Sequence, residues 1–457
     1  MTEERMFSNT DLRRLIIPLI IEQVLAVTVG MADTMMVASS GEAAISGVSL
    51  VDMLNNLLIN VFASLATGGA VVCSQFIGAQ QRQKACDAAK QLLLIGVLLS
   101  TLLMALCLSF RHPLLRLFFG NIEPDVMENA TTYLWISALS YPFLSVYNSG
   151  AALFRAMGNS KVSMVTSIYV NILNIAGNAL LIFGFGLGVA GAAISSLFSR
   201  AVGAVVMVVL LNNPLHPIHI LIKENFRPSL SLIKSILHIG VPNALEGSMF
   251  QLGRVLVVSI ISTFGTVQIA ANAVANTFDS LGCIPGQAIN LAMLAVIGQC
   301  IGAGSLEQVK YYTKKLMKIT YFATAILIIA IFATLPLTFR IYHNISAQAL
   351  ELAAILVLIH NGCALLIWPL SFTLPNVLKA SNDVRFTMVV SIFSMWMFRI
   401  VFSFIIGNWL GLGAIGVWIA MVMDWIFRAA CFIWRYLSGK WKKYSGVPQE
   451  HKRTDTL

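Results

Sequence analysis

The stretch LIIPLIIEQVLAVTVGMADTMMVA, residues 15–38, decides the fold class, because it is apolar and long enough to cross a bilayer as one helix. It nevertheless carries Glu22 and Asp33, and a carboxylate at the centre of a membrane helix costs about 2.5–3.5 kcal/mol on insertion scales. About three helical turns separate the two acids, which places both on one helix face, about 16 Å apart along the axis. Acids in membrane helices usually face a protein interior or water and mark functional sites. The alternative is a structural carboxylate that neighbouring Asn, Ser or Arg side chains satisfy.

The composition of the whole chain is that of a multi-pass membrane protein. Of the 457 residues, 58% are hydrophobic and only 11% are charged, and the mean hydropathy is +0.81. Such segments must be helical, because backbone N–H and C=O groups cannot stay unpaired in lipid. We therefore predict an all-α integral membrane fold with twelve transmembrane helices, near residues 15–38, 46–72, 91–110, 131–153, 162–184, 190–211, 236–262, 269–297, 319–338, 350–375, 386–407 and 414–434.

The distribution of positive charge predicts the orientation. Most of the 30 lysines and arginines fall in the loops and ends that share one side when the N-terminus is cytoplasmic, as the positive-inside rule expects. We predict a protein of the inner (plasma) membrane with cytoplasmic N- and C-termini and no cleaved signal peptide. Topology thereby accounts for the formal charge of +10, which argues against nucleic acid as a partner. The 7 cysteines lack metal-binding spacing and are expected to be reduced.

Matches within the chain collect at one offset, 224 residues, and indicate an internal duplication. The aligned pairs include Pro18 with Pro242, Glu22 with Glu246, QFIGA at 75–79 with QCIGA at 299–303 and, after one inserted residue, GLGVAGAAI at 186–194 with GLGAIGVWI at 411–419. The duplication predicts an N-terminal six-helix bundle (1–211), a cytoplasmic linker (212–235), a C-terminal six-helix bundle (236–434) and a cytoplasmic basic tail (435–457). Two such pseudo-symmetric bundles favour transport by alternating access.

Polar residues share helix faces in both halves. Asn171, Asn174 and Asn178 form one polar face; these amides either bond neighbouring helices or bind a cation or a protonated carboxylate. Asp52 and Asn55 align with Asn276 and Asp279, so an acid and an amide exchange places between the two copies. These residues either line opposite walls of one cavity, which suits a cationic ligand, or form hydrogen-bonded bridges between helices.

Four arginines lie within predicted helices and need partners: Arg200, Arg254, Arg399 and Arg428. Internal ion pairs are the expected account of most of them. His360 is either a proton relay or a hydrogen-bonded interior histidine. The chain has no P-loop, HExxH, GxSxG or CxxC motif, so neither an ATP-driven pump nor an enzyme is expected, and an ion gradient should supply the energy.

The sequence resembles the multidrug and toxic compound extrusion (MATE) family along nearly its whole length. The resemblance rests on five stretches in order: IPLIIEQVLAVTVGMADTMMVASSGEAAISGVSL, QFIGAQ, LFRAMGNSK, NILNIAGNALLIFGFGLGVAGAAIS and GVPNALEGSMFQLG. It implies a secondary antiporter without a cofactor that exports organic, often cationic and amphipathic compounds in exchange for H⁺ or Na⁺.

The resemblance also implies residue roles. The family's first-helix acid matches Asp33, which would work with Asn148, Asn174 and Asn178 and with Glu22 as a further candidate, and a Na⁺ ion would bind near Asp33. Where some prokaryotic relatives carry an Asp in the fifth helix, this chain has Asn178, which leaves Asp33 as the main titrating group. No other metal site is expected.

We expect the substrate, a small organic molecule, to bind between the bundles of a monomer. The predicted cavity residues are Asp52, Asn55, Tyr147, Glu246, Met249, Phe250, Asn276 and Asp279. An alternative is a flippase for lipid-linked oligosaccharides from the same superfamily, although such proteins usually have more helices and a strongly cationic cavity. A membrane enzyme acting on lipid is the third alternative, and it would need a convergent catalytic set that the sequence lacks.

Overall fold

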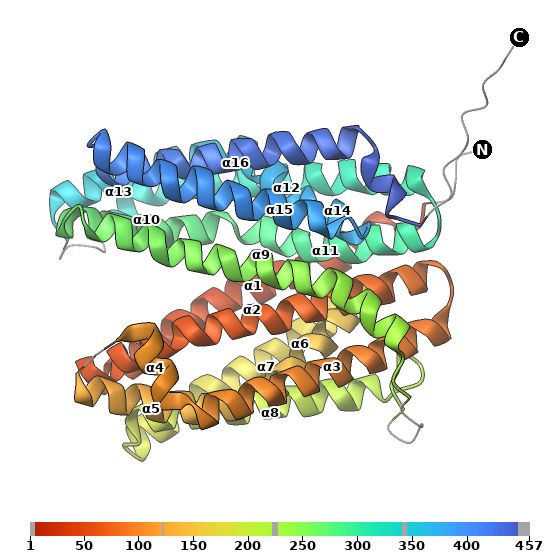
Figure 1. The fold of residues 1–457 in the computed structure, drawn as a ribbon, viewed down its shortest axis with the longest axis horizontal. Helices are drawn as coiled ribbons and strands as arrows, with labels where there is room; N and C mark the ends of the chain where they lie inside the picture. The colour runs from red at the N-terminus through yellow and green to blue at the C-terminus, as the bar shows by residue number, and fades with distance from the viewer. Residues whose placement is uncertain (1–4, 121–122, 222–226, 341–344, 447–457) are drawn as a thin grey trace, which may run out of the picture. The chain divides into compact units, whose positions relative to one another are not determined.

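The computed structural model describes residues 5–120, 123–221, 227–340 and 345–446. Residues 222–226 of the predicted linker and residues 447–457 of the predicted basic tail lie outside this description. The described chain is almost entirely helical and divides into two compact units (Figure 1). The N-terminal unit comprises residues 9–73 and 82–248, and the C-terminal unit comprises residues 1–8, 74–81 and 249–457.

The N-terminal unit is built around α1, α7 and α8. α1 packs against α7, α7 packs against α8, and α6 contacts both α3 and α8. The helices of this half of the chain are α1 (Asn9–Ala38), α2 (Glu42–Gly78), α3 (Arg82–Ser109), α4 (Arg111–Phe119), α5 (Pro124–Leu139), α6 (Tyr141–Ala156), α7 (Ser160–Asn178), the π-helix η1 (Ala179–Gly184) and α8 (Gly188–Leu211).

In the C-terminal unit α10 packs against α13, α11 against α12, and α13 against α16. Its helices are α9 (Leu230–Ser262, of which residues 249–262 belong to this unit), α10 (Thr266–Gly282), α11 (Ile284–Gly302), α12 (Leu306–Phe339), α13 (Ala347–Trp368), η3 (Pro369–Thr373), α14 (Pro375–Ala380), α15 (Val384–Ser394), η4 (Met395–Val401), η5 (Ser403–Trp409), α16 (Gly413–Leu437) and η6 (Lys440–Lys443). η3, η4 and η5 are π-helical, and η6 is a 3-10 helix.

The internal duplication is visible in the helix ends. α1 and α9 end at Ala38 and Ser262, 224 residues apart, and most later helices of the two copies begin or end at the same offset or at 225 after the insertion. The turn after each first helix needs a left-handed residue, and Gly41 and Gly265 supply it with φ of 107° and 98°. Both copies therefore fold with the same turns.

Eleven helical stretches of the described chain are long and apolar enough to cross a membrane. The predicted segment 131–153 is absent from these because it consists of α5 and α6, which meet at Ser140 just before Pro142. The predicted segment 269–297 is likewise split at Cys283 before Pro285, which separates α10 from α11. Proline lacks an N–H and cannot complete the helical ladder, which is consistent with both breaks, although Pro18, Pro242 and Pro336 lie inside continuous helices. With α5 and α6 taken as one crossing, the predicted twelve transmembrane segments are confirmed.

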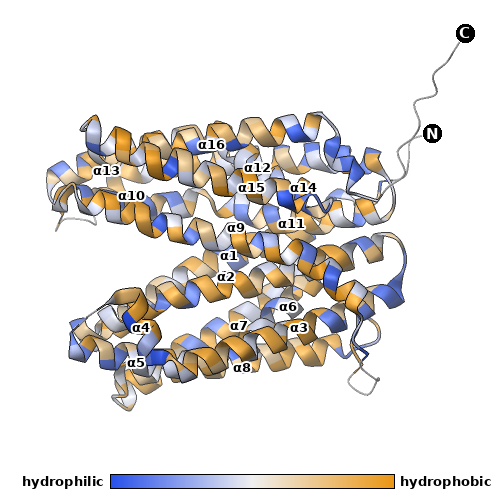
Figure 2. Ribbon diagram, viewed as in Figure 1, coloured by the Kyte–Doolittle hydropathy of each residue, from blue (hydrophilic) through white to orange (hydrophobic). Residues whose placement is uncertain are grey.

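Large apolar side chains cover the outer surfaces of the helices. Leu98, Leu102, Phe198, Phe322 and Ile329 are all more than half exposed, and Figure 2 shows hydrophobic residues along most of the helices with hydrophilic ones concentrated near their ends and in loops. Exposed apolar surface of this extent is typical of contact with lipid.

Two glycines at equivalent positions of the internal repeat allow two helix backbones to approach closely in the C-terminal unit. A Cβ atom on Gly78 would overlap the backbone carbonyl of Gln299, and a Cβ on Gly302 would overlap the carbonyl of Gln75. These residues lie at the ends of α2 and α11, and each pair is the image of the other under the 224-residue offset. The absence of a side chain therefore lets the two helix backbones touch.

We predict that Gly78→Ala or Gly302→Ala destabilises the purified protein, because the added methyl group overlaps backbone atoms of the neighbouring helix and pushes the two helices apart. Overpacking of this kind costs about 1–3 kcal/mol, which a thermal unfolding scan in detergent would register as a lower Tm. The matched control is Gly362→Ala, since nothing lies within 4 Å of a Cβ at that helical position. Equal Tm values for all three variants would contradict the close crossing.

Candidate functional site

Asp33 is held by amides from α7. The Asn178 side-chain nitrogen donates a hydrogen bond of 2.7 Å to Asp33 Oδ1. The Asn174 amide is satisfied when its nitrogen faces Asp33, donating to Oδ1 and Oδ2 at 2.9 and 3.2 Å, while its oxygen accepts from Ser196 Oγ at 3.1 Å. Asn174 and Asn178 are both buried, with 6% and 2% of their surfaces exposed. The structure thus brings together the predicted partners Asp33, Asn174 and Asn178.

Asp52 belongs to the same cluster. It interacts electrostatically with Asp33, and Tyr133 from α5 is hydrogen-bonded to it. Asn55 donates to Asp52 Oδ1 at 3.4 Å and accepts from the Tyr141 hydroxyl at 2.8 Å. Asp52 and Asn55, predicted as cavity residues, therefore connect α2 to the residues that surround Asp33.

Arg200 from α8 supplies the positive charge of this cluster. Its Nη1 donates to Ser140 Oγ at 2.7 Å, and its charge acts on both Asp33 and Asp52. Ser140 stands at the break between α5 and α6, so the interruption of the helix offers a hydroxyl to the arginine. The sequence interpretation left the partner of Arg200 open. The sequence indicates only that Arg200 lies in the sixth predicted helix, which contains no acid, so its partner has to come from another helix.

Glu22 lies in a separate polar network on α1. It accepts a hydrogen bond of 2.8 Å from Ser163 Oγ and forms an ion pair of 3.6 Å with Arg155. Tyr147 interacts with the charges of Glu22 and Arg155. The Asn148 amide nitrogen is buried without a hydrogen bond from any residue that the structure describes. Glu22, Tyr147 and Asn148 are therefore not among the residues hydrogen-bonded to Asp33.

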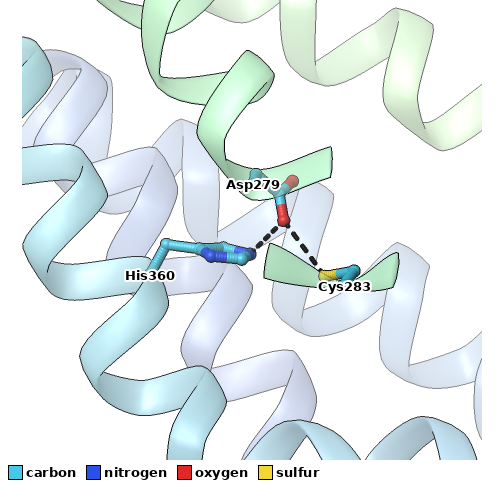
Figure 3. A group of neighbouring side chains, drawn as sticks. All are labelled: Asp279, Cys283 and His360. Carbon is cyan, nitrogen blue, oxygen red and sulfur yellow. Dashed lines mark hydrogen bonds and ion pairs between the residues drawn. The ribbon is translucent and has the colours of Figure 1, made fainter. Parts of the chain in front are cut away.

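Asp279 forms a compact group with His360 and Cys283 in the C-terminal unit (Figure 3). His360 Nε2 lies 2.5 Å from Asp279 Oδ1, and Cys283 Sγ donates to the same oxygen at 3.4 Å. Three such ligand types suit a divalent metal ion, but two ligands of one tetrahedral zinc ion lie about 3.3 Å apart. The carboxylate and imidazole are closer than that, so the arrangement is a close carboxylate–imidazole contact between α10 and α13 and not a set of metal ligands.

Asp424 organises the arginines of η4 and α16. Arg428 Nε donates to its Oδ1 at 2.8 Å, Ser394 donates to the same oxygen, and Arg399 Nη1 lies 3.9 Å from Oδ2. Both guanidinium groups lie over the ring of the predicted cavity residue Phe250. Cζ of Arg399 is 5.3 Å from the ring centroid, and Cζ of Arg428 is 5.9 Å from it. Internal ion pairs, the expected account of these arginines, hold for Arg399 and Arg428.

Arg254 and Asn276 line a small pocket of about 40 Å³ together with Arg399 and Asn272. Asn272 accepts a hydrogen bond of 3.0 Å from Trp418 Nε1. Glu246 and Met249, the remaining predicted cavity residues, stand on α9.

Comparison with known proteins identifies the family. The sequence model of the MatE family matches residues 18–180 and again residues 242–405. The two matches start 224 residues apart and end one residue further apart, which is the offset of the internal repeat with its single insertion. Together they cover more than half of the chain.

Relatives match along nearly their whole length. The chain is 27% identical to the uncharacterized transporter YisQ of Bacillus subtilis, covering 93% of each chain, and 27% identical to the probable multidrug resistance protein NorM of Thermotoga maritima, covering 96% of this chain and 94% of the relative.

Solved structures share the fold. An outward-facing multidrug resistance MATE family transporter of the MOP superfamily superposes with a TM-score of 0.86 at 22% identity, covering 96% of both chains. A MOP superfamily transporter of Pyrococcus furiosus, described by the reverse polarity of its binding pocket, superposes with a TM-score of 0.84 at 21% identity, covering 95% of this chain and 96% of that one. From the repeated family match and the shared twelve-helix fold, the chain belongs to the MatE family and is a multi-pass membrane transporter of small molecules, not an enzyme.

Proposed function

We propose that this transporter is an antiporter that exports organic, amphipathic compounds, cationic ones among them, in exchange for H⁺ or Na⁺ by alternating access. It would act as a monomer in the plasma membrane with both termini in the cytoplasm. Relatives named as multidrug resistance proteins support the substrate class. The observation that carries the proposal is the cluster around Asp33, which holds two carboxylates and one guanidinium inside the N-terminal unit.

The charges of this cluster do not balance without a cation. When Asp33 and Asp52 are both ionised, Arg200 compensates only one of them. An uncompensated charge is costly at membrane depth, so binding one proton or one monovalent cation stabilises the cluster. A site that becomes neutral when it binds one cation is suited to exchange such an ion in each transport cycle.

Asp33 is the group at which we place the coupling ion. Amides from α7 occupy its oxygens on one side, and Asn178 Oδ1 is buried with no hydrogen bond from a described residue. That carbonyl oxygen, beside a carboxylate, is the kind of ligand that a hard cation such as Na⁺ prefers. A protonated Asp33 could equally donate to it after a small rotation of the amide. Both coupling ions fit this geometry.

We predict that Asp33→Asn abolishes ion-driven efflux, because the cluster then balances without a cation and no longer binds one. The measurement is export of a fluorescent organic cation from proteoliposomes under separately imposed H⁺ and Na⁺ gradients. Transport by the variant should fall to that of protein-free vesicles under both gradients, while its elution in size-exclusion chromatography stays that of a folded protein.

The control removes the other carboxylate of α1. Glu22→Gln breaks the pair with Arg155 but leaves Asp33 and its amides untouched, so the gradient dependence should survive even where the rate drops. Undiminished gradient-driven efflux by Asp33→Asn would refute the role of Asp33. Loss of gradient dependence in Glu22→Gln alone would move the coupling site to Glu22.

We predict that Arg200→Gln destabilises the protein, because it leaves two partly buried carboxylates without a nearby guanidinium. Breaking a buried ion pair costs about 3–5 kcal/mol, and the loss of this longer-range attraction should cost less. The double variant Asp52→Asn with Arg200→Gln has one net negative charge in this cluster, as the unmodified protein has. It should therefore recover most of the lost Tm. If the double variant is less stable than Arg200→Gln alone, charge balance does not govern this cluster.

A further inference from the structure

The C-terminal unit contains an arginine without a counter-ion. Arg254 stands on α9 and is exposed to its surroundings, and it makes no hydrogen bond or ion pair within the chain as the structure describes it. A guanidinium on a membrane-spanning helix is costly against lipid and normally faces water or a partner. Its side chain instead lines the small pocket that it shares with Arg399.

Arg399 is incompletely satisfied in the same pocket. It is nine-tenths buried, its Nε has no hydrogen-bond partner among the described residues, and its Nη2 donates to the sulfur of Met421, a weak acceptor, at 3.2 Å. Its nearest carboxylate, Asp424, is 3.9 Å away. A buried guanidinium normally has more hydrogen bonds than this, because unmade ones are expensive in a low-dielectric interior.

The acids of this region are already engaged. Asp424 bonds more closely to Arg428, at 2.8 Å, and to Ser394, and Asp279 is paired with His360. Three guanidinium groups therefore face two carboxylates, which leaves one positive charge in excess while His360 is neutral.

The pocket between the two arginines offers the donors that an anion requires. Asn272 uses its oxygen to accept from Trp418, which leaves its amide nitrogen free to donate, and Asn276 adds a second amide. Val257 and Val417 add apolar surface to the lining, and apolar surroundings strengthen charge-assisted hydrogen bonds. The volume of about 40 Å³ accommodates one small group, not a whole organic molecule.

We infer that Arg254 and Arg399, with the amides of Asn272 and Asn276, form a subsite for an anionic group, a carboxylate or a phosphate, carried by a compound that the protein transports. Guanidinium groups recognise both anions by paired N–H donors. The inference rests on the proposed export function and adds to its substrates amphipathic compounds that bear a negative group, zwitterions included.

The test compares two dyes that differ only at one carboxyl group. Rhodamine 110 has a free carboxylate, and rhodamine 123 is its methyl ester. Binding of each dye to the full-length protein in nanodiscs is measured by fluorescence anisotropy, which requires no ion gradient. We expect rhodamine 110 to bind more tightly by about tenfold, the usual value of a hydrogen bond to a charged group.

Variants locate the effect. Arg254→Gln should remove the preference for rhodamine 110 and leave the affinity for rhodamine 123 unchanged, and Arg254→Glu should reverse the preference in favour of the ester. Arg116→Gln, which removes an exposed arginine of α4 in the other unit, is the matched control and should behave as the unmodified protein. Equal binding of both dyes by the unmodified protein, or a preference that survives Arg254→Glu, would overturn the inference.

A second arm identifies the source of the anion. Rhodamine 110 binding is repeated in nanodiscs that contain phosphatidylglycerol. Weaker dye binding that depends on Arg254 would assign the subsite to a lipid phosphate as well, whereas unchanged binding restricts it to soluble compounds. Failure of gradient-driven efflux in the Asp33 experiment would affect the proposed function without changing this binding result, so the two proposals fail separately.

Discussion

A charged side chain on a membrane-spanning helix has to be compensated by the protein, by a ligand or by water, since lipid provides neither counter-ion nor hydrogen bond. This constraint accounts for the polar clusters of both units. Glu22 is compensated by Arg155 and Ser163, and Asp424 by Arg428. Where the protein's own groups fall short by one charge, the deficit indicates what must come from outside.

The two copies of the duplicated half use one scaffold with opposite charges. Most of their helices begin or end at equivalent residues, yet the place of Asp33 in the second copy is taken by Val257, and the place of Arg254 in the first copy is Gly30. The cluster around Asp33 is one positive charge short, and the cluster around Arg254 is one negative charge short. The two copies thus share a backbone, while substitution within helices gave each unit a different local charge.

The fold and the environment of Asp33 could be predicted from the sequence, because hydropathy, the repeat and the family resemblance are all properties of the order of residues along the chain. The bond of Arg200 to Ser140 and the action of its charge on Asp33 and Asp52 could not, since spacing does not reveal which faces of distant helices meet. Asp279 shows the same limit. Its place in the repeat suggested a substrate cavity, but packing of α10 on α13 brings it to His360. The helix breaks before Pro142 and Pro285 were hidden by the continuous apolar runs around them.

The charged clusters also coincide with departures from regular α-helix. Asn178, which bonds Asp33, is the last residue of α7 before the π-helix η1, and Arg399 stands within the π-helix η4. π-Helical turns are rare and frequent at functional sites, because they interrupt the uniform hydrogen-bond ladder. A ligand acts on conformation only through a difference in its affinity for two states. The cation that we propose at Asp33 would act beside the junction of α7 and η1, where the hydrogen-bond pattern of the helix changes.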